Sequence, residues 1–117
     1  MTQNNRAVGT RYENIASDFL TACGYSLLER NFRSRIGEID IVASENDCIC
    51  FVEVKYRKDL SSGFPAEAVT KTKQKKIIQT ANYYLMTHPF AGSLIRFDVV
   101  EIVGDKIRLI RNAFGGI

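Results

Sequence analysis

Apolar residues recur every three or four positions in two separate parts of the chain, a spacing typical of amphipathic helices. Thr10 and Glu13 open the first part with the spacing of a capping box, in which both side chains accept hydrogen bonds from backbone N–H groups at a helix start. The first helix is therefore predicted over residues 10–23 and ends before Gly24. The second ends near Pro89 and has apolar positions at Ile77, Ile78, Ala81, Tyr84 and Leu85.

The segments between and after these helices have strand patterns. A short extended segment at residues 25–29 precedes a basic connector that contains Arg30, Arg33 and Arg35. Residues 38–42 alternate between polar and apolar side chains, residues 48–56 are rich in β-branched and aromatic ones, and the turn residues Asn46-Asp47 lie between them. Together they predict a hairpin. Two further strands, 94–103 and 107–110, flank a predicted type II′ turn at Gly104-Asp105.

The order helix, three strands, helix, two strands predicts an α/β or α+β layer with helices packed on a mixed sheet, and of these two classes α/β is the prediction. At 117 residues, the chain has the length of one domain with its own core, so residues 1–117 are expected to form a single domain. The hydrophobic fraction of 45% and charged fraction of 25% are those of an ordinary globular protein. The loop at residues 57–65, with Ser61-Ser62-Gly63, is expected to be mobile.

The cysteines and the first residues indicate the cellular compartment. The odd number of cysteines and the lack of a C-x-x-C spacing favour reduced core thiols at Cys23, Cys48 and Cys50. The first six residues have no apolar stretch of the kind a signal peptide needs, and no later run approaches the length of a membrane span. A cytoplasmic protein that does not enter a membrane is expected.

A two-residue turn at Asn46-Asp47 would fix the register of the predicted hairpin. One face of the hairpin then becomes continuously apolar, with Ile39 opposite Val54 and Ile41 opposite Val52. The other face has Val42 opposite Phe51, Asp40 opposite Glu53 and Glu38 opposite Lys55.

This register predicts a local excess of negative charge, because two facing carboxylates about 4.5–5.5 Å apart at Cβ destabilise a sheet without a compensating cation. One explanation is that Lys55 neutralises one carboxylate and solvent screens the rest. The other is a Mg²⁺ ion, which favours carboxylates, water and phosphate oxygens. The apolar neighbours Phe51, Val52 and Val54 favour a pocket rather than a solvated surface, and hence the second explanation.

Alternation along a strand sends Glu53 and Lys55 to the same face, so that a metal ligand and an ammonium group share one site. Phosphodiester hydrolysis needs such a pair: a metal that polarises the phosphoryl oxygen and activates water, and a cation that stabilises the developing charge.

Several strings resemble one known family: Gly37-Glu-Ile-Asp-Ile41, Phe51-Val-Glu-Val-Lys55, Pro65-Ala-Glu-Ala-Val69 with Lys73-Gln74, and Arg96-Phe-Asp-Val-Val100. They are similar to the bacterial YraN-like family of the restriction-endonuclease-like superfamily, which resembles archaeal Holliday-junction resolvases. The resemblance covers nearly the whole chain. It implies that Asp40, Glu53 and Lys55 match the superfamily's P-D…(D/E)-x-K signature, with Ile39 in place of the proline. Glu13 matches an additional acid on the helix of resolvase-like members.

The resulting hypothesis is a nuclease with the restriction-endonuclease-like fold, in which Asp40, Glu53 and the Val54 carbonyl bind Mg²⁺. Mn²⁺ can substitute, Lys55 stabilises the transition state, and Glu13 completes the site. The substrate would be nucleic acid, with DNA favoured and branched or junction DNA among the candidates. A non-catalytic nucleic-acid-binding or adaptor module is the main alternative, and an interaction protein that uses an apolar sheet edge is a third. A homodimer is expected by analogy with resolvases only.

The net charge is only +3, but basic residues are concentrated in one stretch, residues 54–77. Arg57, Lys73 and Lys76 are predicted to contact phosphates, the alternative being a solvated helix face. Gln79 and Tyr83 have the spacing of a motif in exonuclease-like relatives, although packing explains Tyr83 as well. Asp98 is predicted to be a hydrogen-bonded structural acid, and His88 a cap or surface residue.

Overall fold

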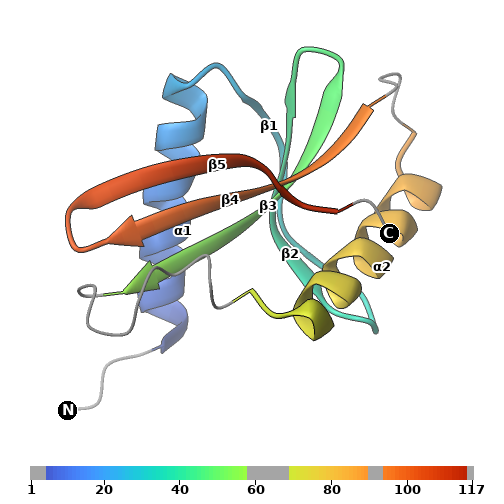
Figure 1. Ribbon diagram of the computed structural model, residues 1–117, viewed down its shortest axis with the longest axis horizontal. Coiled ribbons are helices and arrows are strands. Elements are labelled where there is room, and N and C mark those ends of the chain that lie inside the picture. Colours follow the sequence, from blue (N-terminus) through green and yellow to red (C-terminus); the bar gives the residue numbers. More distant parts are fainter. Residues whose placement is uncertain (1–4, 58–68, 90–93, 116–117) are drawn as a thin grey trace.

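The computed structural model describes residues 5–57, 69–89 and 94–115, and its five strands form one sheet in the order β1-β2-β3-β4-β5 (Figure 1). The predicted α/β fold, mixed sheet and element order are confirmed. The loop predicted at residues 57–65 lies, beyond Arg57, outside the described residues. The elements are α1 (Asn5–Ala22), β1 (Ser26–Arg33), β2 (Glu38–Glu45), β3 (Cys48–Arg57), α2 (Lys71–Thr87), β4 (Leu94–Val103) and β5 (Lys106–Phe114).

The sheet is buried on both faces at its centre. β3 and β4 are parallel, whereas the other neighbours are antiparallel, and the β3-to-β4 crossover contains α2. Alternate residues of β3 pack to opposite sides: Cys50 and Val52 lie in a cluster with α1, and Ile49 and Phe51 lie in a cluster with α2. This two-sided burial explains why β3 reads as a nearly continuous apolar run.

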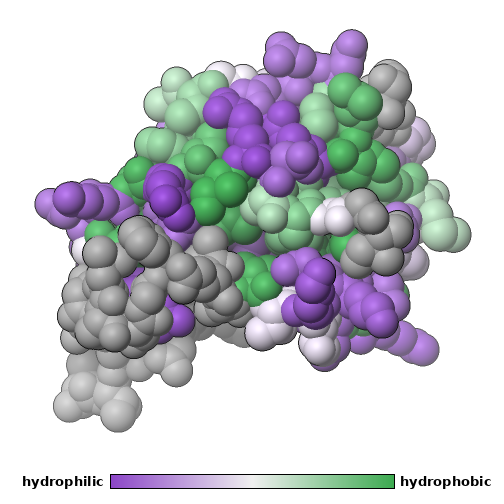
Figure 2. Space-filling view, viewed as in Figure 1, coloured by the Kyte–Doolittle hydropathy of each residue, from purple (hydrophilic) through white to green (hydrophobic). Residues whose placement is uncertain are grey.

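The outer strands are less apolar than the centre. Every residue of β5 is exposed or half-buried. On the face viewed in Figure 2, hydrophilic and hydrophobic residues are intermixed over the molecule. Neither described helix has the length and apolar character that crossing a membrane would require.

Three predictions near the N-terminal half are wrong. The first helix begins at Asn5, so Thr10 lies inside it and cannot form a capping box with Glu13. β1 extends to Arg33 because it pairs along its length with β2, and Phe32 is buried there. Cys48 and Cys50 are buried free thiols, but Cys23 is exposed because it follows the last turn of α1.

The predicted hairpin register is confirmed from Ile41, opposite Val52, to the turn at Asn46-Asp47. It does not continue further, since the ladder between β2 and β3 ends at Ile41. Ile39 packs in the α2 cluster, while Ile41 packs in the α1 cluster, so the expected continuous apolar face is wrong. The change of side occurs beside Asn31 of β1, which has a left-handed backbone (φ 56°).

The second hairpin follows the prediction more closely. β4 has the predicted bounds, and Gly104 has the positive φ of 60° that the first central residue of a type II′ turn requires. β5 is longer than expected and reaches Phe114, because its ring stacks on Phe97 of β4 at 5.3 Å.

Candidate active site

Asp40 lies where β2 leaves β3. Its Oδ2 accepts a hydrogen bond of 2.8 Å from the Val54 N–H, so this carboxylate joins the two strands after their ladder has ended. Glu38, which was expected opposite Lys55, instead lies exposed and pairs with Arg33 at 3.2 Å. The extrapolated register is therefore wrong beyond Ile41, where neither Glu38–Lys55 nor Asp40–Glu53 is a ladder pair, although Asp40 still lies next to the Glu53–Lys55 segment.

Glu53 is buried, with 6% of its surface exposed. Its Oε1 lies 3.6 Å from Lys55 Nζ and 3.0 Å from Lys73 Nζ. Lys73 belongs to the first turn of α2, which is fixed by Thr70, whose side chain caps the helix by accepting the Lys73 N–H. Two ammonium groups from different elements thus converge on one carboxylate.

Asp40 has an unfavourable electrostatic environment. Burial and the nearby charge of Glu53 raise the pKa of Asp40 to about 8; the Val54 N–H and Lys73 oppose the shift, and Glu13 adds to it. Burial also lowers the pKa of Lys55, as does its neighbour Lys73, against the attraction of Glu53. Burial therefore disfavours the charged forms of both Asp40 and Lys55.

Glu13 adjoins the site from α1. Its closest described cation is Arg30, with Nη2 3.7 Å from Oε1, and this oxygen is buried without a hydrogen bond in the described part of the chain. Glu13 also lines a cavity of about 430 Å³ with residues of β1 and β2. The capping box predicted for Glu13 is excluded, its ion pair with Arg30 is a structural role, and its part in the site stays a prediction.

The donor set can be compared with the needs of Mg²⁺. Across residues 5–57, 69–89 and 94–115, no three His, Cys, Asp or Glu side chains gather as a metal-binding group. Two carboxylates are nevertheless sufficient for Mg²⁺, which usually keeps several waters and also takes substrate phosphate oxygens. The raised pKa of Asp40, and a Glu13 oxygen that has no hydrogen bond and lies 3.7 Å from Arg30, both fit a site that could take a further cation.

The three predicted phosphate contacts lie in different places. Lys73 is at the site itself, a position that sequence analysis missed because it depends on how α2 docks. Lys76 is exposed on the next part of α2, and its Cβ is near Gly37. Arg57 ends β3, and its carbonyl accepts the Gly104 N–H at 3.0 Å.

Two other sequence interpretations are confirmed. Asp98 is fully buried and accepts hydrogen bonds from Tyr25 (2.8 Å), Arg96 and the Asn112 N–H (2.9 Å), as a structural acid should. His88 caps the end of α2, where its N–H donates to the Tyr84 carbonyl at 2.8 Å.

Glu45 lies outside the site, and its ion pairs with Arg111 and Arg96 allow a test of how a paired acid stabilises the fold. Hydrogen bonds from Arg111, and then from Arg96, hold the pKa of Glu45 at about 2, although burial opposes them. Because this pKa is below its ordinary value of 4.5, the stabilisation is present above pH 4.5 and is lost as the pH falls towards 2. We expect Glu45→Gln to lower the free energy of unfolding at pH 7 by about 2 kcal/mol, allowing for solvent screening.

Urea unfolding of both proteins between pH 2 and 7 measures this difference, which should shrink steadily on acidification. Glu38→Gln, in an exposed ion pair with Arg33, is the matched control and should change stability by less than about 0.5 kcal/mol. An equal effect of both substitutions, or one that does not depend on pH, would contradict the assignment.

The fold and the site together define a class: an α/β protein with a mixed five-stranded sheet and a buried carboxylate–lysine cluster where two strands part. Residues 12–102 match the sequence profile of the uncharacterised protein family UPF0102, so the chain belongs to this family. A relative named "UPF0102 protein" from Lachnoclostridium phytofermentans is 49% identical over 112 residues, which cover 95% of each chain. Another, from Caldicellulosiruptor saccharolyticus, is 43% identical and covers 95% of this chain and 99% of its own.

Proposed function

We propose that this protein is a metal-dependent nuclease of the restriction-endonuclease-like superfamily that hydrolyses phosphodiester bonds in nucleic acid. The observation that carries the proposal is the convergence of Asp40, Glu53 and Lys55 at the point where β2 and β3 separate. A buried Glu53 beside the half-buried Asp40 costs stability, and perturbed carboxylates of this kind cluster at functional sites.

In this proposal, Asp40 and Glu53 would hold Mg²⁺ or Mn²⁺ with the Val54 carbonyl, and Glu13 would complete the site. The bound ion would polarise the phosphoryl oxygen and lower the pKa of a water molecule. The Lys55 ammonium would stabilise negative charge that develops on the phosphate. Lys73, which now neutralises Glu53, would be available to the substrate phosphate once another cation balances that carboxylate.

One observation favours the alternative of a non-catalytic nucleic-acid-binding module. Lys55 and Lys73 together neutralise Glu53, so this acid has a stable arrangement without any metal. In such a module, the lysines would bind phosphate and the acids would only position them. The two functions differ in turnover, not in affinity.

The test is cleavage by the purified protein of single-stranded, duplex, flapped and four-way-junction DNA, and of RNA, with Mg²⁺, with Mn²⁺ or with EDTA. Cleavage that requires the divalent ion supports the nuclease. Binding without cleavage on every substrate supports the module. Light scattering on the same preparation tests the homodimer that analogy with resolvases predicts.

Substitution of Lys76 tests a predicted phosphate contact separately from phosphodiester cleavage. We expect Lys76→Ala to weaken binding without sequence preference and to reduce the slope of log affinity against log salt by roughly 0.7–0.9, since one phosphate contact releases about one counterion. Anisotropy titrations at several salt concentrations measure the slope. Lys75→Ala, an exposed neighbour on another side of α2, is the control. Equal slopes in the wild type and Lys76→Ala would show that Lys76 makes no phosphate contact and belongs to a solvated helix face.

A further inference from the structure

A second cavity, of about 580 Å³, lies between the turn that joins β1 to β2 and the second half of α2. We call this cavity the turn groove; its lining residues are Arg33, Ser34, Arg35, Ile36 and Tyr83. No predicted ligand of the metal site lines it.

The turn groove has fixed walls. The Ser34 side chain accepts the Ile36 and Gly37 N–H groups at 3.1 and 3.3 Å, and its backbone N–H donates to the Gly37 carbonyl at 2.8 Å. Gly37 packs closely on α2, because a Cβ there would lie 3.4 Å from Thr80 Oγ1. The turn is thus closed by its own hydrogen bonds and held against the helix before any ligand arrives.

The lining combines flat apolar surface with positive charge. Tyr83 is 46% exposed and Ile36 is 42% exposed, although both are large hydrophobic residues. The Tyr83 ring packs beside the Phe32 ring, with centroids 6.1 Å apart. Arg33, which ends β1 and pairs with Glu38 at 3.2 Å, and Arg35, which lies in the turn, are both exposed. An aromatic ring beside guanidinium groups is the arrangement that binds single-stranded nucleic acid, with bases on the ring and phosphates on the cations.

One side of α2 connects the turn groove to the active site. Lys73, Lys76 and Tyr83 lie at intervals of three and seven residues and therefore share a helix face, on which Thr80 is buried against Gly37. Lys73 contacts Glu53 at one end, and Tyr83 lines the groove at the other. At the rise of an α-helix, the two are roughly 15 Å apart along its axis, a span of a few nucleotides.

We propose that the turn groove binds an unpaired base of the nucleic-acid substrate, a few nucleotides from the phosphate at Asp40, Glu53 and Lys55. This proposal rests on the proposed function and specifies its substrate class: nucleic acid with unpaired nucleotides next to the cleavage point. A base within a duplex is stacked on its neighbours and has no free face for Tyr83. Charge complementarity between Arg33, Arg35 and Lys76 and the phosphates holds the strand along α2.

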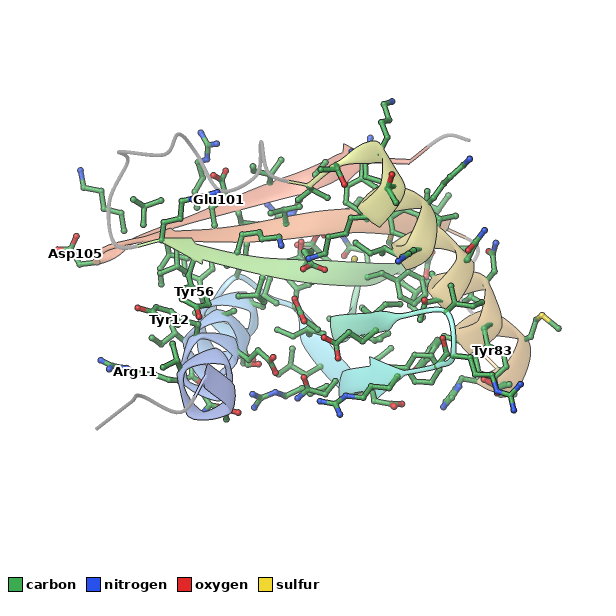
Figure 3. The ribbon with its side chains drawn as sticks, turned by 90° about the horizontal axis from the view of Figure 1, so that it is seen from below. Arg11, Tyr12, Tyr56, Tyr83, Glu101 and Asp105 are labelled. Carbon is green, nitrogen blue, oxygen red and sulfur yellow. The ribbon has the colours of Figure 1, made fainter. Side chains whose placement is uncertain are left out.

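The test compares two equally exposed tyrosines. Tyr56 is 42% exposed, but it stacks on Tyr12 of α1 at 3.9 Å, at the opposite end of the molecule from Tyr83 (Figure 3). Wild type, Tyr83→Leu, Tyr83→Phe and Tyr56→Leu are titrated in EDTA with a labelled single-stranded oligonucleotide and with a duplex of equal charge. Thermal melting of each variant confirms that it is folded.

Tyr83→Leu should bind the single strand roughly 5- to 150-fold more weakly, the effect of losing one stacked base, and the duplex almost as well as the wild type. Its salt dependence should not change, because no charge is removed. Tyr83→Phe keeps the ring and should bind like the wild type, as should Tyr56→Leu. Unchanged single-strand binding by Tyr83→Leu, equal losses in both leucine variants, or no single-strand binding by the wild type would overturn the proposal.

Cleavage assays separate this result from the proposed nuclease. If Tyr83→Leu binds and cleaves every substrate like the wild type, while divalent-dependent cleavage still requires Lys55, the groove proposal fails and the nuclease remains. If Tyr83→Leu loses single-strand binding but no protein cleaves any substrate, the groove remains and the nuclease fails.

Discussion

Replacement of Lys55 by methionine is expected to slow divalent-dependent cleavage by about 10²–10³-fold while nucleic-acid binding stays nearly intact. An ammonium group cannot ligate a divalent cation, so its loss removes charge stabilisation without removing a metal ligand. Methionine keeps most of the apolar stem of this half-buried side chain. Glu53 retains Lys73 as an ion-pair partner at 3.0 Å, so the variant does not leave this buried carboxylate unpaired.

Single-turnover cleavage and anisotropy binding, measured on the same preparations, test this expectation. Lys75→Met is the control, because Lys75 is an exposed lysine of α2 outside the site. Cleavage at equal rates by the wild type and Lys55→Met would point to a contaminating nuclease or to a wrong role for Lys55. A parallel loss of binding and cleavage would show that Lys55 binds the ground state rather than the transition state.

Replacement of Asp40 by asparagine should stabilise the metal-free protein and at the same time abolish its stabilisation by Mg²⁺. The folded protein raises the pKa of Asp40 from 3.8 to about 8, so its ionised form is disfavoured and stability declines as the pH rises from about 4 to 8. Asparagine removes that cost and can still accept the Val54 N–H. At pH 8 in EDTA, we expect a gain on the order of 2 kcal/mol in the free energy of unfolding.

Stabilisation by Mg²⁺ should be present in the wild type and absent from Asp40→Asn. In the wild type, Mg²⁺ at 100 times its dissociation constant would stabilise by about 2.7 kcal/mol. The effect should be stronger at pH 8 than at pH 5, because a proton must leave Asp40 before it can bind the ion. Asp40→Asn should show little or none of it. Urea unfolding at both pH values, with Mg²⁺ or with EDTA, measures all four conditions.

Asp98→Asn is a suitable control for this experiment. Asp98 is also buried, but it is paired with Arg96 at 2.9 Å, so asparagine should destabilise the protein and leave any response to Mg²⁺ unchanged. Destabilisation by Asp40→Asn at pH 8 would contradict the electrostatic account of the site. A wild-type protein whose stability does not respond to millimolar Mg²⁺ or Mn²⁺ would contradict the metal site itself.

Sequence patterns predicted the part of this site that local rules control. The two-residue turn at Asn46-Asp47 and strict alternation fix the hairpin up to Ile41, and hence the approach of Asp40 to residues 53–55. Beyond Ile41, β2 follows β1 instead of β3, and this competition between neighbouring strands leaves no signal in the hairpin alone.

Long-range packing decided the remaining differences. Thr10 and Glu13 satisfy the local rule for a helix start, yet the helix begins earlier, at Asn5, and Glu13 faces Arg30 of β1. In the sequence, Lys73 is one of several lysines at the start of a helix. Only the docking of α2 on the sheet places Lys73 against Glu53. Single-sequence patterns contain the spacing within an element but not the position of that element in space.

The parallel pairing of β3 with β4 also determines the order in which the molecule can fold. β2 with β3, and β4 with β5, are antiparallel neighbours joined by two-residue turns, so each hairpin has low contact order and can form quickly. β3 and β4 meet only after the chain between Arg57 and Leu94 has closed, and this closure costs entropy before any contact repays it. The Lys73–Glu53 contact belongs to that late step. A nascent chain would therefore form the β2–β3 hairpin, which ends next to Asp40 and Glu53, before the α2 side of the site exists.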